Sequence, residues 1–186
     1  MRPYTVVGSE RHRIGRFDVC QDTLLIDQKK YPYSYTRMKE SVAIIPINED
    51  TQVMGLVYQY RHSIDSWVYE AAAGAIEKGE TPEAAAIREL KEETGFVVEP
   101  ENLIALGAVY PVAGISNEKM HLFVGRGFTQ TEPQSEPTEF VKPYIMTVAD
   151  FEKRILDGTF SNMYGIALWY KYLLYKKKQD WDLGGA

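Results

Sequence analysis

Three glutamates and one arginine are grouped between Arg88 and Glu93, and their spacing could build a metal site. On a helix, Glu89, Glu92 and Glu93 lie three or four residues apart and share one face. They also lie toward the C-terminal end, where the helix dipole is already negative, so their presence costs stability. A hard divalent cation reverses these costs, because Mg²⁺ prefers carboxylate oxygens. The spacing predicts a divalent-metal site, and a solvated acidic surface is the alternative that the glutamates alone leave open.

The segment that carries these carboxylates is predicted to be a helix over residues 81–94. Thr81 can cap its first turn, Pro82 suits the first helical position, and Gly95 stands where a left-handed C-cap is common. Upstream lies a loop with small and acidic residues at Gly74, Gly79 and Glu80. A glycine-flanked loop before clustered carboxylates can bring a metal and a phosphate close to the backbone, which favours the metal site over the solvated surface.

The rest of the chain mixes short strands with helices. Apolar and alternating stretches predict strands at 41–48, 52–60, 103–110 and 119–128, and the first two form a predicted hairpin. Helices are predicted at 148–156 and 162–176, and an exposed loop at 129–138. Because no regular βαβ spacing appears, we expect an α/β (α+β) sandwich with a mixed sheet over residues 41–180, preceded by a small β-strand region over residues 1–40.

The composition excludes several classes of protein. The 186 residues are 45% hydrophobic and 25% charged, with a net charge of −5, as in an ordinary globular protein. The negative balance argues against a nucleic-acid polymer as partner. Cys20 is the single cysteine, which excludes a disulfide framework and makes a reducing, cytoplasmic compartment the expectation. No apolar run has the length of a signal peptide core or a membrane span, so no membrane partner is expected.

The carboxylate segment resembles a known family motif. The matching residues, in order and spacing, are Gly74, Glu80, Arg88, Glu89, Leu90, Glu92, Glu93, Gly95 and Phe96. This set resembles the Nudix box, which is glycine, five residues, glutamate, seven residues and then R-E-aliphatic-x-E-E-x-G-aliphatic, with Phe96 in the last position. The resemblance implies an α/β/α sandwich with a mixed sheet, and hydrolysis of a nucleoside diphosphate joined to another group.

The same resemblance implies a role for each box residue. Glu89 and Glu93 are the main ligands of Mg²⁺, with Mn²⁺ as the alternative ion, and Glu92 also lies at the metals. Arg88 orients the carboxylates. Glu80 supports the box directly or through a water, and Gly74 and Gly95 complete its structural part.

Both flanks of the box resemble the sugar-nucleotide branch of the family, typified by ADP-ribose pyrophosphatases. The matching stretches are Gln59-Tyr60-Arg61, Trp67, Glu70 with Ala73-Gly74, Tyr110 to Gly114, and Ser116-Asn117-Glu118. The resemblance implies that the Ala73 carbonyl is a metal ligand. It implies substrate contacts for Arg61, Trp67, Glu70, Pro111 and Gly114. Ala72 and Val112-Ala113 depart from the branch, which often has Pro and Ser-Pro there, and these departures bear on the substrate more than on the reaction.

Two flank residues also have ordinary structural interpretations. Trp67 could be an aromatic of the core or of a dimer interface rather than a stacking platform for the substrate. Arg61 could be the partner of a surface ion pair, although its place at a strand end beside the box favours phosphate binding.

The general base is expected outside the box. In the ADP-ribose branch it comes from a loop far downstream, and the matching stretch here is 132–139. Glu139 is the first candidate and Glu136 the second, with solvated loop acids as the alternative. Glu92 is the catalytic candidate within the box.

The implied reaction is hydrolysis of ADP-ribose to AMP and ribose 5-phosphate, in a homodimer whose N-terminal strands contribute to the partner's site. Other sugar nucleotides such as GDP-mannose, or dinucleoside polyphosphates, are the alternatives within the fold. A non-catalytic Nudix module that senses a nucleotide is the alternative from another class, and such modules usually lose box carboxylates, all of which this chain keeps.

Overall fold

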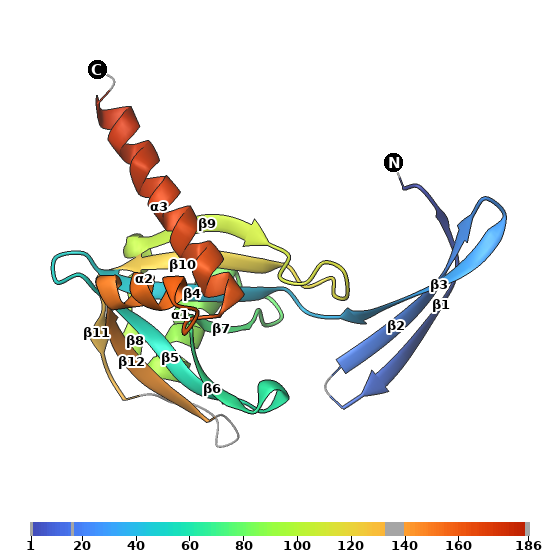
Figure 1. Cartoon of the computed structure of the whole chain (residues 1–186), viewed down its shortest axis with the longest axis horizontal. Helices are drawn as coiled ribbons and strands as arrows, with labels where there is room; N and C mark the ends of the chain where they lie inside the picture. The colour runs from blue at the N-terminus through green and yellow to red at the C-terminus, as the bar shows by residue number, and fades with distance from the viewer. Residues whose placement is uncertain (1, 16, 133–139, 185–186) are drawn as a thin grey trace. The chain divides into compact units, whose positions relative to one another are not determined.

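The computed structural model describes residues 2–15, 17–132 and 140–184, with side chains as far as residue 179 (Figure 1). The chain divides into two compact units. One contains Met1–Glu40 with Tyr110–Lys119, and the other contains Ser41–Val109 with Met120–Ala186. The segment Tyr110–Lys119 is distant in sequence from the other part of its unit, and the composition of the chain gave no sign of this association.

The first unit is a three-stranded antiparallel meander, β1 (Thr5–Ile14), β2 (Phe17–Ile26) and β3 (Lys29–Arg37). Asp27 and Gln28 turn the chain between β2 and β3 with φ of 47° and 63°, the left-handed conformations that tight hairpins require. The segment Tyr110–Lys119 is fastened to β3 and the residues after it. The Tyr33 hydroxyl donates to the carbonyl oxygen of Gly114 at 3.1 Å.

The second unit is built on a seven-stranded mixed sheet in the order β12-β5-β4-β10-β9, with β6 added beside β5 and β7 beside β4. Its strands are β4 (Ser41–Asn48), β5 (Val53–Arg61), β6 (Ser66–Glu70), β7 (Ala72–Ala75), β9 (Leu103–Val109), β10 (Met120–Arg126) and β12 (Val141–Thr147). Only the β4–β10 pair is parallel. Strand β4 is buried on both faces, which explains its uninterrupted apolar sequence.

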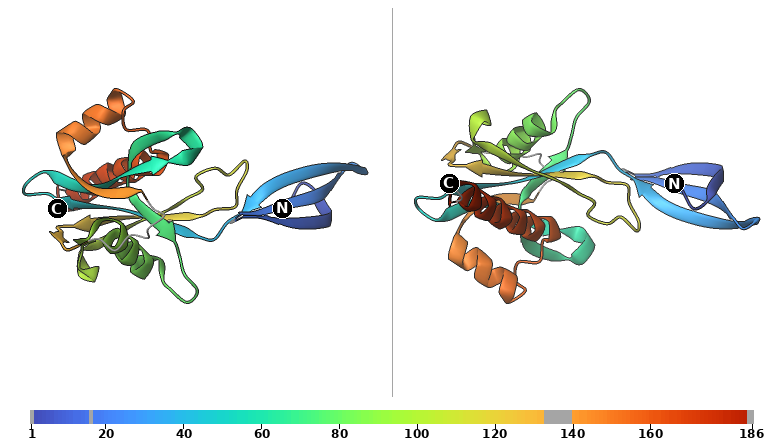
Figure 2. Two further views of the ribbon diagram at one scale, coloured as in Figure 1. Left: turned by 90° about the horizontal axis from the view of Figure 1, so that it is seen from below. Right: turned by 90° about the horizontal axis from the view of Figure 1, so that it is seen from above.

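Helices cover both faces of this sheet (Figure 2). Helix α1 (Pro82–Thr94) lies on one face, and α2 (Val148–Leu156) and α3 (Met163–Gly184) lie on the other. Side chains of β4 alternate between two hydrophobic clusters, with Val42 and Ile44 packed toward α1 and Ala43 and Ile45 packed toward α2 and α3. The mixed-sheet α/β (α+β) sandwich that the sequence predicts is therefore confirmed.

Most of the predicted elements are present. The hairpin of β4 and β5 and the helices over 81–94 and 148–156 are confirmed, and α3 extends beyond the predicted 162–176. Strands β6, β7 and β12 were missed. The start of the predicted loop at 129–138 is wrong, because Thr129–Gln130 form β11, which pairs with β8 (Phe96–Val97). A two-residue strand is stabilised by its distant partner, so its own sequence carries no strand pattern.

Short 3-10 helices occupy His62–Ile64 after β5 and Pro100–Asn102 before β9. Within the part of the chain that the structure describes, no helix is both long enough and apolar enough to cross a bilayer.

Candidate active site

The helix α1 begins and ends where the sequence predicts. The Thr81 hydroxyl accepts a hydrogen bond from the backbone N–H of Ala84 at 3.2 Å, and Pro82 occupies the first helical position. At the other end, Gly95 adopts φ of 71° and its N–H donates to the carbonyl of Lys91. These caps fix the register of the helix and therefore the direction in which its carboxylates point.

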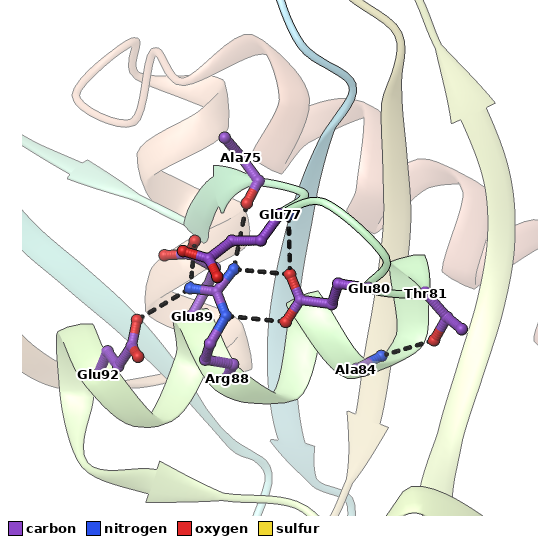
Figure 3. A network of polar contacts seen from close by, with 8 residues as sticks. All are labelled: Ala75, Glu77, Glu80, Thr81, Ala84, Arg88, Glu89 and Glu92. Carbon is purple, nitrogen blue, oxygen red and sulfur yellow. Dashed lines mark hydrogen bonds and ion pairs between the residues drawn. The ribbon is translucent and has the colours of Figure 1, made fainter.

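The Arg88 guanidinium is the centre of the polar network of the box (Figure 3). Its Nε and Nη2 donate to the two oxygens of Glu80 at 2.8 and 2.9 Å. Its Nη1 donates to Glu89 at 2.8 Å and to Glu92 at 3.0 Å. Nη2 also donates to the carbonyl oxygen of Ala75 at 3.1 Å. A guanidinium has five N–H donors, and these five bonds use all of them. The resemblance implied that Arg88 orients the carboxylates of the helix; its bonds to Glu80 and to the Ala75 carbonyl were not predicted.

This network shifts the ionisation of its members. The hydrogen bonds from Arg88 hold the pKa of the Glu80 carboxyl below its ordinary value. In return, the bonds first to Glu80 and then to Glu89 raise the pKa of Arg88. Glu80 also accepts from the backbone N–H of Glu77 at 3.0 Å, which closes the loop before the helix. Glu80 therefore contacts Arg88 directly and the start of the loop through Glu77.

Two carboxylates of α1 meet the backbone of β7. Glu93 is 8% exposed, and its carboxylate accepts a hydrogen bond from the N–H of Ala73 at 3.0 Å. A Cβ added at Gly74 would lie 2.0 Å from the carboxyl carbon of Glu89 and 2.2 and 2.3 Å from its oxygens. Gly74 is therefore needed because the carboxylate of Glu89 fills the space that any other residue's Cβ would take.

The donor set of this region fits a hard divalent cation. It consists of oxygens alone, from the carboxylates of Glu89, Glu92 and Glu93 and from the backbone of β7 next to Ala73. Such sets suit Mg²⁺ or Mn²⁺ rather than softer metals. Among the described residues, no three His, Cys, Asp or Glu side chains are already gathered into a ligand group. In this arrangement Arg88 is bonded to both Glu89 and Glu92. A cation would be held by carboxylates that the arginine otherwise neutralises.

Arg61 and Glu70 form a partly buried ion pair. Arg61 Nε donates to one oxygen of Glu70 at 3.0 Å and Nη2 donates to the other at 2.6 Å. The Arg61 side chain is 42% exposed, whereas that of Glu70 is 8% exposed. The ion pair raises the pKa of Arg61, first through its hydrogen bonds to Glu70. Arg61 is thus the partner of an ion pair, and part of its side chain remains exposed to solvent.

The other predicted substrate residues lie in different surroundings. Trp67 on β6 is 38% exposed and stacks on Tyr58 with ring centroids 5.1 Å apart, and Lys142 Nζ lies 5.0 Å from its ring centre. Pro111 and Gly114 belong to the first unit, where the Gly114 carbonyl accepts from Tyr33. Both predicted bases, Glu136 and Glu139, lie outside the described residues.

Two further polar residues of the site were missed. Gln59 and Tyr164 both donate to Glu70, at 3.2 and 2.5 Å. Gln59 was noted only as part of a motif, whereas Tyr164 is 94 residues from Glu70 and no sequence spacing could connect them.

Comparison with known proteins agrees with this geometry. The model of the NUDIX domain matches residues 37–164. The chain is 33% identical over 148 residues to a methanol dehydrogenase activator from Bacillus methanolicus, with 73% of this chain and 78% of that protein covered. It is 32% identical over 117 residues to an ADP-ribose pyrophosphatase from Bacillus subtilis (strain 168), covering 62% of each, so the match spans less than two thirds of that relative.

The crystal structure of an ADP compounds hydrolase shares the fold. It matches with a TM-score of 0.83 over 96% of this chain and 97% of that chain, at 22% sequence identity. The chain belongs to the Nudix family. The resemblance seen in the box is therefore confirmed, as is the class of enzyme, a Nudix pyrophosphohydrolase. The shared fold confirms the Nudix-type sandwich.

The contact between Gly74 and Glu89 leads to the first prediction. Gly74→Ala should leave the fold intact, because the flexible carboxylate of Glu89 can move away from the new methyl group. That movement takes a proposed ligand out of place, so the affinity for Mn²⁺ measured by calorimetry should fall about ten- to a hundredfold. Gly8→Ala is the control, since a Cβ there meets only Thr23 at 3.6 and 3.7 Å. Unchanged Mn²⁺ affinity in Gly74→Ala would contradict the assignment.

Proposed function

We propose that this protein is a Mg²⁺-dependent hydrolase of the diphosphate linkage in nucleoside diphosphate sugars, and that ADP-ribose, cleaved to AMP and ribose 5-phosphate, is its main substrate. The observation that carries the proposal is the array of three glutamates on α1, joined through Arg88 to the loop and through Glu93 to the backbone at Ala73. The similarity to the ADP-ribose pyrophosphatase of Bacillus subtilis supports the choice of substrate.

The box residues have separate tasks in the proposed reaction. Glu89 and Glu93, with Glu92 and the Ala73 carbonyl, hold Mg²⁺, and Mn²⁺ is the ion that can replace it. When bound, the cation neutralises the diphosphate and lowers the pKa of a water molecule. Arg88 restrains Glu89 and Glu92, so that little ordering remains to be done when substrate arrives. Glu80 keeps Arg88 in place through two hydrogen bonds.

Substrate recognition is proposed to come from the flanks of the box. The exposed edge of Arg61 neutralises a phosphate. Trp67, which stacks on Tyr58 on the other face of the β5–β6 pair, offers an aromatic surface. Glu70, Pro111 and Gly114 complete the proposed set. The proton of the attacking water is proposed to pass to Glu139, or to Glu136 as the second candidate, and Glu92 is the catalytic candidate within the box.

Two alternatives have their own distinguishing observations. An enzyme that prefers GDP-mannose or a dinucleoside polyphosphate would use the same box, and only the substrate contacts of the flanking residues would differ. A nucleotide-sensing module without turnover would keep the fold, and the Bacillus methanolicus relative, an activator of methanol dehydrogenase, is the reason to retain that possibility. The complete set of box carboxylates favours catalysis over sensing.

The compartment is proposed to be the cytoplasm. The free, buried thiol of Cys20 is compatible with a reducing environment and needs no oxidised partner.

The protein is further proposed to act as a homodimer through its first unit. The three strands of that unit carry many exposed apolar side chains, among them Val7 at 46%, Ile14 at 62%, Tyr31 at 45% and Tyr33 at 43% exposure. Such a surface favours a protein partner. Sedimentation velocity on the full chain should give a mass near twice 21.3 kDa. A monomer mass throughout the micromolar range would overturn the dimer proposal.

Removal of a single carboxylate charge tests the enzyme proposal. Glu93→Gln keeps an oxygen that can accept from the Ala73 N–H, so the fold should persist. The loss of a metal ligand should lower kcat by about a hundredfold or more. Turnover should be measured with Mg²⁺ across ADP-ribose, GDP-mannose, other sugar nucleotides and dinucleoside polyphosphates.

Glu83→Gln is the matched control, because Glu83 is an exposed residue of the first turn of the same helix. The proposal fails if the wild type cleaves no diphosphate or if Glu93→Gln leaves turnover unchanged. A preference of about tenfold or more for another nucleotide would reject ADP-ribose as the substrate and keep the reaction.

Exchange of the loop glutamates tests the proposed base. Glu139→Gln should lower kcat about a hundredfold or more, since general bases contribute on that scale, with Mn²⁺ affinity unchanged. Glu136→Gln should have the smaller effect. The reverse order would transfer the role to Glu136, and full activity in both variants would exclude both glutamates as the base.

A further inference from the structure

The carboxylate of Glu70 is the meeting point of three elements of the second unit. It is 6% exposed and accepts four hydrogen bonds. The donors are Arg61 Nε at 3.0 Å, Arg61 Nη2 at 2.6 Å, Gln59 Nε2 at 3.2 Å and the Tyr164 hydroxyl at 2.5 Å. A buried carboxylate with several donors is held in one orientation, and it holds its donors in turn.

This meeting point lies close to the proposed metal site. Glu70 precedes Ala73 by three residues, so the two Cα atoms are at most about 11 Å apart. Successive side chains of a strand point to opposite faces, so Val57, Gln59 and Arg61 share one face of β5. Val57 packs in the hydrophobic cluster that contains residues of α1. Arg61 therefore leaves β5 on the side of the sheet that carries the box helix.

The ion pair uses only one edge of the Arg61 guanidinium. The edge formed by Nε and Nη2 is bonded to the two oxygens of Glu70. The second edge, formed by Nη1 and the other hydrogen of Nη2, is the one that can receive a second anion in two parallel bonds. The bonds to Glu70 use no hydrogen of Nη1, and the Arg61 side chain is 42% exposed. The Tyr164 hydroxyl lies close enough to Arg61 to help raise the pKa of the guanidinium.

Tyr164 contributes the third element, because it lies in the first turn of α3. This turn is fixed by the side chain of Asn162, which accepts from the N–H of Gly165 at 2.9 Å. Burial, together with the neighbouring charge of Glu70, raises the pKa of the Tyr164 hydroxyl. The hydroxyl therefore remains a donor throughout the working range of pH.

We propose that Tyr164 is a positioning residue for substrate, which acts through Glu70 to hold the free edge of Arg61 toward a phosphate of the diphosphate. In this arrangement Glu70 contributes to substrate recognition through Arg61. The proposal rests on the proposed function, since it names how that site recognises its substrate. It makes α3, which supplies no residue of the box, a determinant of substrate affinity.

The hydroxyl of Tyr164 can be removed without changing the shape of the side chain. Tyr164→Phe should raise KM for ADP-ribose about three- to tenfold and change kcat less than about twofold, because Arg61 loses part of its restraint while the metal ligands are untouched. Tyr170→Phe is the matched control on the same helix, since Tyr170 is 62% exposed. It should leave both constants unchanged.

A double-mutant cycle separates positioning from a merely structural role. In an Arg61→Ala background, Tyr164→Phe should cause no further rise in KM, because there is no guanidinium left to position. An equal rise in both backgrounds, or no rise in either, would overturn the proposal. Should Tyr164→Phe fail to fold, Glu70→Asp, which withdraws the carboxylate by one methylene, takes its place in the same cycle.

Direct binding makes the test independent of turnover. Calorimetric titration of ADP-ribose in EDTA should show about tenfold weaker binding for Arg61→Ala and the same non-additive pattern with Tyr164→Phe. If ADP-ribose binding shows this non-additive pattern but the wild type cleaves no diphosphate, the proposed function fails and the positioning role stands. If it cleaves ADP-ribose and the cycle is additive, the positioning role fails and the function stands.

Discussion

The rest of this site depends on the hydrogen bonds of Arg88, which use every N–H donor of its guanidinium. Three glutamates within five residues of a helix repel one another, and each lies at the unfavourable end of the helix dipole. Arg88 offsets these costs by giving its five N–H groups to Glu80, Glu89, Glu92 and the Ala75 carbonyl. The same guanidinium therefore neutralises the helix and ties it to the preceding loop. Arg88 therefore orders the carboxylates, which repel one another, without the help of a cation.

The sheet supplies the second half of the arrangement. Strand β7 pairs with the first half of β4, with Ala73 opposite Ala43 and Gly74 opposite Val42. Because β4 is buried on both faces, it cannot shift its register without exposing apolar side chains to water. The backbone at Ala73 and Gly74 is thus held beside the carboxylates of Glu93 and Glu89. Hydrophobic packing several residues away fixes where the oxygens of the proposed metal site lie.

The sequence predicted what depends on local spacing. The caps at Thr81 and Gly95, the helix between them and the shared face of the glutamates all follow from residues within one or two turns. Strand β7 was missed because its four residues, Ala72–Ala75, have no alternating pattern and become a strand only by pairing with β4. The bonds from Tyr164 to Glu70 and from Arg88 to Ala75 join elements that only the tertiary fold brings together, so no spacing rule reaches them.

Arg61 and Arg88 differ in how many of their N–H groups the surrounding residues use. Arg88 has no N–H left after its bonds to the box, so it can restrain carboxylates but cannot receive a substrate group without breaking one of them. Arg61 gives only one edge to Glu70 and keeps the other. The partners of Arg88 lie on α1, in the loop before it and at the end of β7. Arg61 is bonded to Glu70 on β6, which also accepts from Gln59 on β5 and Tyr164 on α3. A change in the packing of α3 can therefore reach Arg61 through Tyr164 while the carboxylates of α1 keep their positions.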